Sequence, residues 1–263
     1  MTETNDWALI LGASSGFGEA TSLRLAEEGF NIFGVHLDRR SAEAQVAGIV
    51  ARIEAAGRQA QFFNVNAADP EKRASVLDAI GARIGETDQV RVLMHSLAFG
   101  TLKPFVADGP KERIDQLSMD MTLNVMAHSL VYWSQELVAR KLMRAGGRIF
   151  AMTSAGSRVI WKSYGAVSAA KCALESHCRQ LAVELGPLGI GVNALLAGVT
   201  DTPALRKIPG NEQMIQQALA RHPRGRLTRP EDVAGAIAAL SRPEAGWITG
   251  NTIFVDGAET ITG

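Results

Sequence analysis

Cysteine is scarce in this chain, and long apolar runs are missing. The 263 residues contain two cysteines, Cys172 and Cys178, which lie six positions apart on a predicted helix. That spacing argues against a disulfide between them, so we expect buried, reduced thiols in a cytoplasmic protein. No stretch approaches the roughly 18 apolar residues of a membrane span. Residues 1–6 are polar and the apolar run after them is short, so we expect neither a signal peptide nor a membrane anchor.

Excess charge and metal-ligand patterns are also lacking. Lys and Arg together number 27, as do Asp and Glu, so the formal net charge is zero. A neutral chain has no electrostatic footprint for nucleic acid or an anionic membrane. The five histidines show no metal-ligand spacing, and we expect no metal site. Hydrophobic residues make up 46% of the chain, which is enough for a substantial core.

Short apolar runs alternate with longer amphipathic segments. The runs predict strands at 8–11, 31–36, 61–65, 90–95, 147–152, 190–195 and 252–255. The amphipathic segments predict helices at 18–28, 42–56, 71–84, 114–126 continuing toward 138, and 164–185. This alternation is typical of βαβ units and predicts an α/β fold: one doubly wound (Rossmann) domain over 1–263, with a parallel sheet of about seven strands. No linker, repeat or low-complexity tract divides the chain.

Residues 200–228 interrupt this alternation. They carry Pro203, Pro209 and Pro223 around a short helical pattern at 212–221. The segment follows the sixth predicted strand, at the carboxyl end of the sheet, where open α/β sheets bind their ligands. We therefore expect residues 200–228 to form a substrate lid.

A glycine-rich segment directly follows the first predicted strand and opens the first predicted helix. It reads Gly12-Ala-Ser-Ser-Gly16-Phe-Gly18. Glycines let backbone N–H groups approach a pyrophosphate, and the helix N-terminus favours its negative charge. Ser14 and Ser15 could add hydroxyl donors. An ordinary tight turn is the alternative, but the position of the segment favours a nucleotide site.

Residues at the end of the second predicted strand would contact the adenosine ribose of the cofactor. Its sequence is His36-Leu-Asp38-Arg39-Arg40, with no carboxylate at the strand end itself. Arg39 and Arg40 could hold a 2′-phosphate, whereas Asp38 argues for an unphosphorylated ribose. A solvated charged turn is a third interpretation. NADPH is the preferred prediction, with NADH as the alternative.

Tyr164 lies seven residues before Lys171. On a helix this is about two turns, so both side chains would share one face, roughly 10 Å apart along the axis. A cation on the same face would lower the pKa of the phenol and make it a proton donor. Taken alone, such a pair is more often an unrelated surface tyrosine and lysine. Other segments of the chain are therefore needed to distinguish a catalytic pair from a surface pair.

Five features resemble the short-chain dehydrogenase/reductase family over residues 7–257. They are the glycine loop, Asn64-Val65 after the third strand, Asn124 in the long helix, Ser154 after the fifth strand, and Lys171. Most of that family has a tyrosine four residues before the lysine, where this chain has Val167. Tyr164 stands about one turn further back, a spacing that resembles the enoyl-acyl carrier protein reductases of bacterial fatty-acid synthesis.

Further segments resemble the same reductases. Residues 95–100 replace the Asn-Asn-Ala-Gly of the wider family, and Ala197-Gly198 replaces its Pro-Gly. Residues 201–210 are similar to the NADPH-using type III branch, and the glycine loop has the ordinary family form rather than the longer form of the NADH-using enzymes. The resemblance implies reduction of the C2–C3 double bond of trans-2-enoyl thioesters on acyl carrier protein by a homotetramer.

The resemblance also implies roles for individual residues. The catalytic set is Tyr164, Lys171, Ser154 and Asn124. The cofactor-binding set is Gly12, Ser14, Ser15, Gly16, Phe17, Gly18, Arg39, Arg40, Asn64, Val65, Ser96, Leu97, Ala98, Lys171, Gly198, Val199, Thr200 and Thr202. The substrate-binding set is Phe99, Gly100, Tyr164 and Leu205. We expect His95 to be a satisfied strand-end histidine rather than a base.

The displaced tyrosine suits enoyl chemistry. Hydride arrives at C3 of the enoyl group, and the negative charge develops on the more distant thioester oxygen. Tyr164 lies three residues before the usual position, which moves the acid back by about one turn, or roughly 4.5 Å along the helix. This displacement is of the same order as the extra distance from the carbon that accepts hydride to the thioester oxygen. A carbonyl reductase or alcohol dehydrogenase of the same family, for example on 3-ketoacyl thioesters, is the alternative. A non-catalytic nucleotide-sensing protein on this fold would be expected to lack Tyr164 or Lys171.

Basic residues cluster in the predicted lid region. They are Arg206, Lys207, Arg221 and Arg224. Because acyl carrier protein is acidic, we expect it to dock there; a solvated basic face is the equally weighted alternative.

Overall fold

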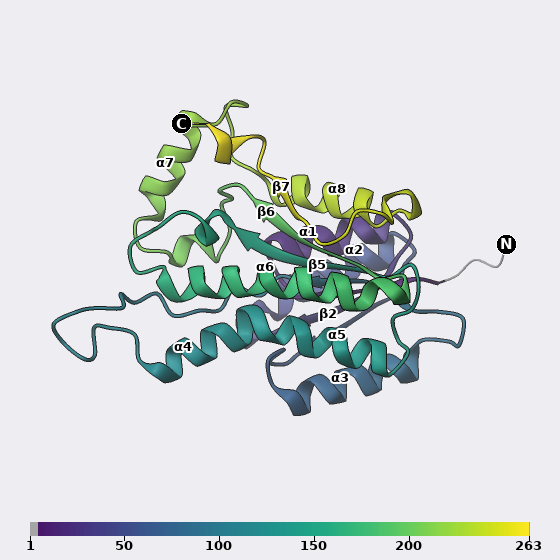
Figure 1. The fold of residues 1–263 in the computed structure, drawn as a ribbon. Helices are drawn as coiled ribbons and strands as arrows, with labels where there is room; N and C mark the ends of the chain where they lie inside the picture. The colour runs from purple at the N-terminus through teal and green to yellow at the C-terminus, as the bar shows by residue number, and fades with distance from the viewer. Residues whose placement is uncertain (1–4, 263) are drawn as a thin grey trace.

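Seven strands form one parallel sheet in the computed structural model, which describes residues 5–262 (Figure 1). They are β1 (Trp7–Leu11), β2 (Asn31–His36), β3 (Ala60–Asn64), β4 (Val90–His95), β5 (Arg148–Ser154), β6 (Gly191–Ala197) and β7 (Thr252–Val255). Their order is β3-β2-β1-β4-β5-β6-β7, and every neighbouring pair is parallel. The predicted doubly wound α/β fold is confirmed.

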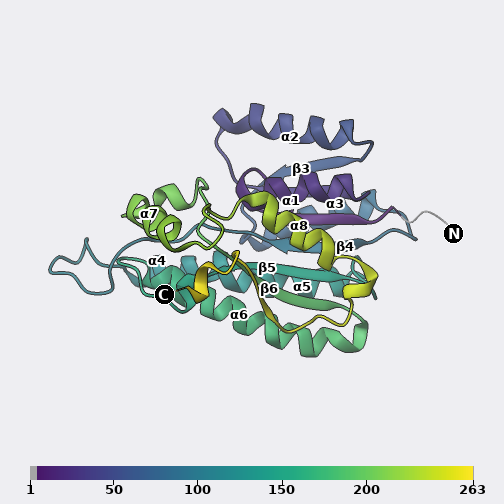
Figure 2. The ribbon, with the colours of Figure 1, turned by 90° about the horizontal axis from the view of Figure 1, so that it is seen from above.

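Helices cover both faces of this sheet (Figures 1 and 2). One face carries α1 (Gly16–Glu27), α2 (Glu43–Ala55) and α8 (Pro230–Leu240). The other carries α3 (Pro70–Arg83), α4 (Gln116–Leu123), α5 (Ser129–Ala139) and α6 (Gly165–Leu185). Two hydrophobic cores result, one on each side of the sheet. Strands buried on both faces need continuous apolar runs, which explains the fully buried sequence Trp-Ala-Leu-Ile-Leu of β1.

Two helical features differ from the sequence prediction. Helix α8 was not predicted, although Pro230 at its first position and the backbone N–H of Arg229 donating to Asp232 Oδ2 (2.8 Å) mark a helix start. The predicted long helix 114–138 is interrupted by a π-helical turn at Asn124–His128, which joins α4 to α5. Such turns are frequent at functional sites, and this one begins at the predicted catalytic asparagine.

The predicted lid lies at the carboxyl end of the sheet, where Figure 1 shows α7 (Asn211–Arg221). The short helix expected at 212–221 is thus confirmed. A hydrogen bond from Trp161 Nε1 to the carbonyl oxygen of Pro209 (2.9 Å) ties the lid to the loop between β5 and α6. The lid therefore has a direct contact with the segment that leads into Tyr164.

The cysteine prediction is half wrong. Cys178 is buried as expected, but Cys172 is exposed on the outer side of α6, because only one face of this helix contacts the sheet; both thiols are free. Among residues 5–262, none of the helices combines the length and apolar character that a membrane-spanning helix needs. The same part of the chain holds no cluster of three or more potential metal ligands from His, Cys, Asp and Glu.

Candidate active site

Three glycines shape the turn between β1 and α1. Gly12 and Gly16 have φ angles of +91° and +54°, which glycine adopts without strain. A Cβ on Gly12 would lie 2.4 Å from the carbonyl oxygen of Ser96, and a Cβ on Gly18 would lie 2.0 Å from that of Gly12. The chain therefore folds tightly on itself here and presents backbone groups at the N-terminus of α1, as binding a pyrophosphate requires.

This turn lies where the strand order of the sheet changes direction. Strands β2 and β3 lie on one side of β1, whereas β4 and the later strands lie on the other. The backbone N–H of Ser96 donates to the carbonyl oxygen of Leu11 (2.9 Å), which places the end of β4 beside the glycine turn. Thr202 packs against Gly16 from the lid side, 3.4 Å from where a Cβ would stand. Predicted cofactor residues from three distant segments thus meet at a topological switch point.

The turn after β2 is held by its own side chains. The carboxylate of Asp38 contacts His36 Nδ1 at 2.9 Å, and the Asn64 side chain bonds both the N–H and the carbonyl of Asp38, each at 3.0 Å. Asn64 thus shapes this turn from β3. Arg40 is almost fully exposed, 3.8 Å from Glu43, and Arg39 makes no ion pair within residues 5–262. Both guanidinium groups are available to an anion.

Tyr164 directly precedes the first residue of α6. Ser163 before it has a φ of +61°, a left-handed conformation that turns the chain into the helix. A Cβ on Gly156 would lie 2.4 Å from the Tyr164 ring and 3.1 Å from Ser154 Oγ. Gly156, which the sequence reasoning missed, leaves the space in which the phenol lies beside Ser154.

The predicted lowering of the Tyr164 pKa is wrong. Burial raises the pKa of the phenol, and the neighbouring Ser154 hydroxyl offsets this only in part. Lys171 does not counteract burial, because its ammonium group is turned toward the sheet and donates to the carbonyl oxygen of Met152 (2.7 Å). The phenol is therefore neutral at neutral pH and retains a proton to donate.

Lys171 is buried, with 6% of its surface exposed. Desolvation lowers its pKa to about 8, against the opposing effect of the negative charge of Glu175. Most Lys171 side chains thus carry a charge at pH 7, although a modest change in their surroundings would alter that balance.

His95 is fully buried at the end of β4. Its Nε2 lies 2.8 Å from Ser129 Oγ, and that hydroxyl donates to the carbonyl oxygen of Val125. Nε2 must therefore carry the proton and donate it, which leaves Nδ1 unprotonated and without a hydrogen-bond partner. The expected structural histidine is present, but only one of its nitrogens is satisfied. Burial, assisted by the charge of Lys171, lowers the pKa of His95 to about 3.

Other predicted residues occupy varied settings. Ser154 Oγ is buried without a hydrogen-bond partner, as expected for a group that serves a ligand. Asn124 opens the π-helical turn, and Gly100 faces Thr122, Met126 and Val167 so closely that a Cβ would clash. Phe99 is 61% exposed and Leu205 only 8%. Their roles in substrate binding stay predictions.

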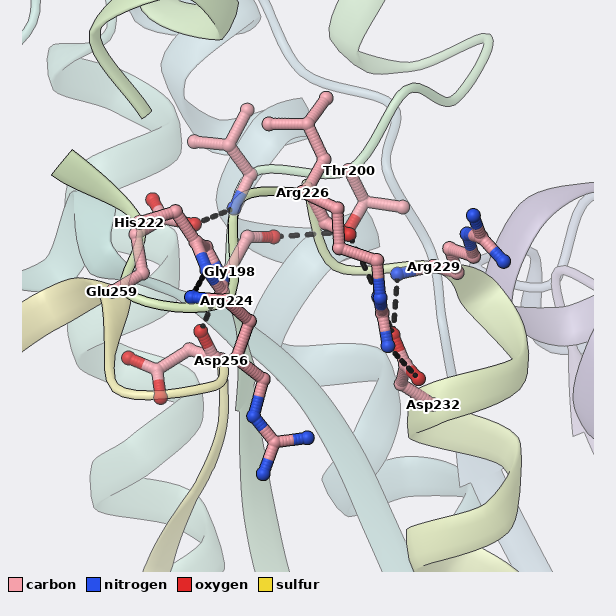
Figure 3. A network of polar contacts seen from close by, with 11 residues as sticks. Gly198, Thr200, His222, Arg224, Arg226, Arg229, Asp232, Asp256 and Glu259 are labelled. Carbon is pink, nitrogen blue, oxygen red and sulfur yellow. Dashed lines mark hydrogen bonds and ion pairs between the residues drawn. The ribbon is translucent and has the colours of Figure 1, made fainter. Parts of the chain in front are cut away.

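The loop after β6 is held by the C-terminal segment of the chain (Figure 3). The N–H of Val199 donates to Glu259 Oε2 (2.9 Å), and Thr200 Oγ1 donates to the carbonyl oxygen of Gly198 (2.9 Å). His222 Nε2 contacts the carbonyl oxygen of Asp256 at 3.0 Å, which ties the end of the lid to the same segment. The sequence reasoning missed Glu259, since no local pattern links it to a loop 60 residues away.

Comparison with known proteins identifies the family. A family model described as enoyl-(acyl carrier protein) reductase matches residues 12–258. The chain belongs to this family of short-chain dehydrogenases/reductases. It is therefore an NAD(P)-dependent oxidoreductase.

Relatives within the family act on several substrates. The chain is 33% identical to a 1-cyclohexenylcarbonyl-CoA reductase of Streptomyces collinus, over 97% of this chain and 86% of that protein. It is 27% identical to a 3-oxoacyl-[acyl-carrier-protein] reductase of Thermotoga maritima, over 96% and 97% of the two chains. A solved short-chain dehydrogenase of Burkholderia cenocepacia in complex with NADP superposes with a TM-score of 0.81, at 27% identity and 98% coverage of both chains.

Proposed function

We propose that this enzyme reduces the C2–C3 double bond of trans-2-enoyl thioesters with NADPH. The observation that carries the proposal is the position of Tyr164, directly before the first turn of α6. Lys171 lies two turns further along the helix, where its ammonium group donates a hydrogen bond to the carbonyl oxygen of Met152. An acid displaced in this way suits charge that develops on the distant thioester oxygen. The Streptomyces collinus relative supports the proposal, because the substrate in its name is a thioester whose carbonyl is conjugated to a double bond.

The residues present fit a dinucleotide. The backbone of Gly12–Gly18 and the N-terminus of α1 would hold the pyrophosphate, and Lys171 would bond the nicotinamide ribose. Arg39 and Arg40 would hold a 2′-phosphate, while Asp38 is engaged by His36. When bound, the nicotinamide supplies the hydride.

The side chains of the site would then stabilise the developing charge. Tyr164, whose raised pKa keeps it protonated, donates to the thioester oxygen in the manner of an oxyanion hole. Lys171 adds positive potential nearby as long as it is an ammonium ion. The hydroxyl of Ser154, which lies beside the phenol, would orient Tyr164 or the thioester.

Reduction of a carbonyl group is the second candidate, favoured by the 3-oxoacyl reductase relative. A crossed assay separates the two: NADPH or NADH with crotonyl or acetoacetyl thioester, followed by cofactor absorbance. Consumption of NADPH with the crotonyl thioester and not with the acetoacetyl thioester is the expected result. The reverse pattern would reject enoyl reduction.

We further propose that the acyl group arrives on acyl carrier protein, which would dock on the basic lid region. Arg206 is less suited to this than expected, because Asp201 pairs with it at 2.8 and 2.9 Å. We therefore expect the exposed residues Lys207, Arg221 and Arg224 to provide the positive charges that contact the acidic carrier protein. Charge reversal of Lys207 and Arg221 should raise KM for the carrier-linked substrate but not for its coenzyme A analogue. Equal effects on both substrates would exclude docking at this surface. The homotetramer and the cytoplasmic location stay predictions.

A further inference from the structure

Three ionisable side chains form a buried stripe along α6. Lys171, Glu175 and Cys178 are exposed to 6%, 8% and 1%. Spacings of four and three residues place them on one helical face, which packs against β5 and β6. A buried glutamate is uncommon unless it is paired, and the reduction described above assigns Glu175 no role.

Two hydrogen bonds join this stripe to consecutive residues of β5. Lys171 Nζ donates to the carbonyl oxygen of Met152, and Thr153 Oγ1 donates to Glu175 Oε1, each at 2.7 Å. The next residue of the strand is Ser154. The carboxylate of Glu175 is therefore held in place one helical turn from Lys171, at the strand end that carries the predicted catalytic serine.

Glu175 is the group that supplies negative charge near Lys171. On the same helix, burial raises the pKa of the Cys178 thiol to about 12, so the thiol is neutral. On β4, His95 is neutral because its pKa is about 3. Tyr164, on the loop before α6, is neutral because its pKa is raised. His95 and Tyr164 therefore cannot offset the desolvation that favours a neutral Lys171, and Glu175 raises the pKa of Lys171 more than Cys178 does.

We propose that Glu175 is a positioning residue which, tethered by Thr153, keeps Lys171 protonated for its work at the active site. The charge of Glu175 counters desolvation and so supports the pKa of about 8. An opposite charge at short range shifts a pKa by about one to three. Without Glu175, Lys171 would lose its proton within the neutral range. The inference rests on the proposed role of Lys171, but it is independent of which double bond the enzyme reduces.

The test is an NMR titration of the lysine side chains in the full-length protein, compared between wild type and Glu175→Gln. Glutamine keeps an acceptor for Thr153 and removes only the charge. We expect the midpoint of Lys171 to fall from about 8 by about one or more. Turnover should then fall about fivefold at pH 8 and by only about a tenth at pH 6, as a one-unit fall in pKa requires. Glu175→Asp should restore most of the midpoint, and Glu184→Gln on the exposed side of α6 should leave it unchanged.

An unchanged Lys171 midpoint in folded Glu175→Gln protein would overturn the proposal. If that variant does not fold, Thr153→Val is nearly isosteric and frees the carboxylate without removing it. It should lower the midpoint by a smaller amount, and an unchanged midpoint there would overturn the proposal as well. The titration needs no substrate, so a protein that shows the shift but does not reduce enoyl thioesters would reject the proposed function and leave the role of Glu175 intact.

Discussion

His95 should make the fold sensitive to mild acid. Its Nε2–H donates to Ser129, and its buried Nδ1 has no partner, so a second proton would be both unsolvated and unbonded. Lys171 adds like-charge repulsion. The folded protein therefore resists a proton that the unfolded chain readily accepts.

The size of the effect follows from the two pKa values. The pKa of His95 is about 3 in the folded protein, against 6.5 as the ordinary value. Between these values the unfolded chain binds a proton that the folded chain does not, so the free energy of unfolding falls as the pH falls. Each pH unit costs about 1.4 kcal/mol, which amounts to about 2 kcal/mol between pH 7 and pH 5. This is a substantial part of the roughly 5–15 kcal/mol that stabilises a typical domain.

Urea unfolding at pH 7, 6 and 5 would measure this loss, with His95→Gln as the comparison. Glutamine can still donate to Ser129 but does not titrate. Carboxylates elsewhere contribute equally to both proteins and cancel in the difference. We expect the gap between the two unfolding free energies to change by about 2 kcal/mol over this range, with wild type losing more. Parallel pH dependences of the two proteins would refute the reasoning.

Three further predictions concern the site. Tyr164→Phe should lower kcat by about a hundredfold or more and leave the NADPH dissociation constant, measured by fluorescence, unchanged; weakened binding of similar size would contradict a role in charge stabilisation. Gly18→Ala should abolish NADPH binding because its Cβ would overlap the carbonyl of Gly12, whereas Gly48→Ala, with open space around it, should bind normally. Arg39→Ala should raise KM for NADPH about tenfold and hardly affect NADH; equal changes would exclude a 2′-phosphate contact.

Much of the fold could be predicted because short segments of the sequence indicate its strands and its glycine turn. Buried parallel strands need apolar runs, and the turn at Gly12–Gly18 needs residues without a Cβ. Both signals lie within a few consecutive residues, so they can be recognised without knowledge of the rest of the chain. Helix α8 has a comparable local signal in Pro230 and Asp232, although it was not among the predicted helices.

The electrostatics of the site could not be predicted in this way. The spacing of Tyr164 and Lys171 indicated an acid whose pKa is lowered by a cation, yet the tertiary structure turns Lys171 onto Met152 and buries the phenol. Whether a charge faces its neighbour or the strand beneath it depends on how α6 packs on β5. Desolvation likewise depends on every element that covers the group.

The sequence by itself determined the fold class, the glycine turn and the displaced tyrosine, because periodicity, missing Cβ atoms and residue spacing are properties of the local chain. Only the tertiary structure decided which groups are charged and which residues support them. Glu175 lies 22 positions from Thr153, and Glu259 lies 60 from Val199. Contacts of that kind arise when separate segments pack together, and no local pattern encodes them.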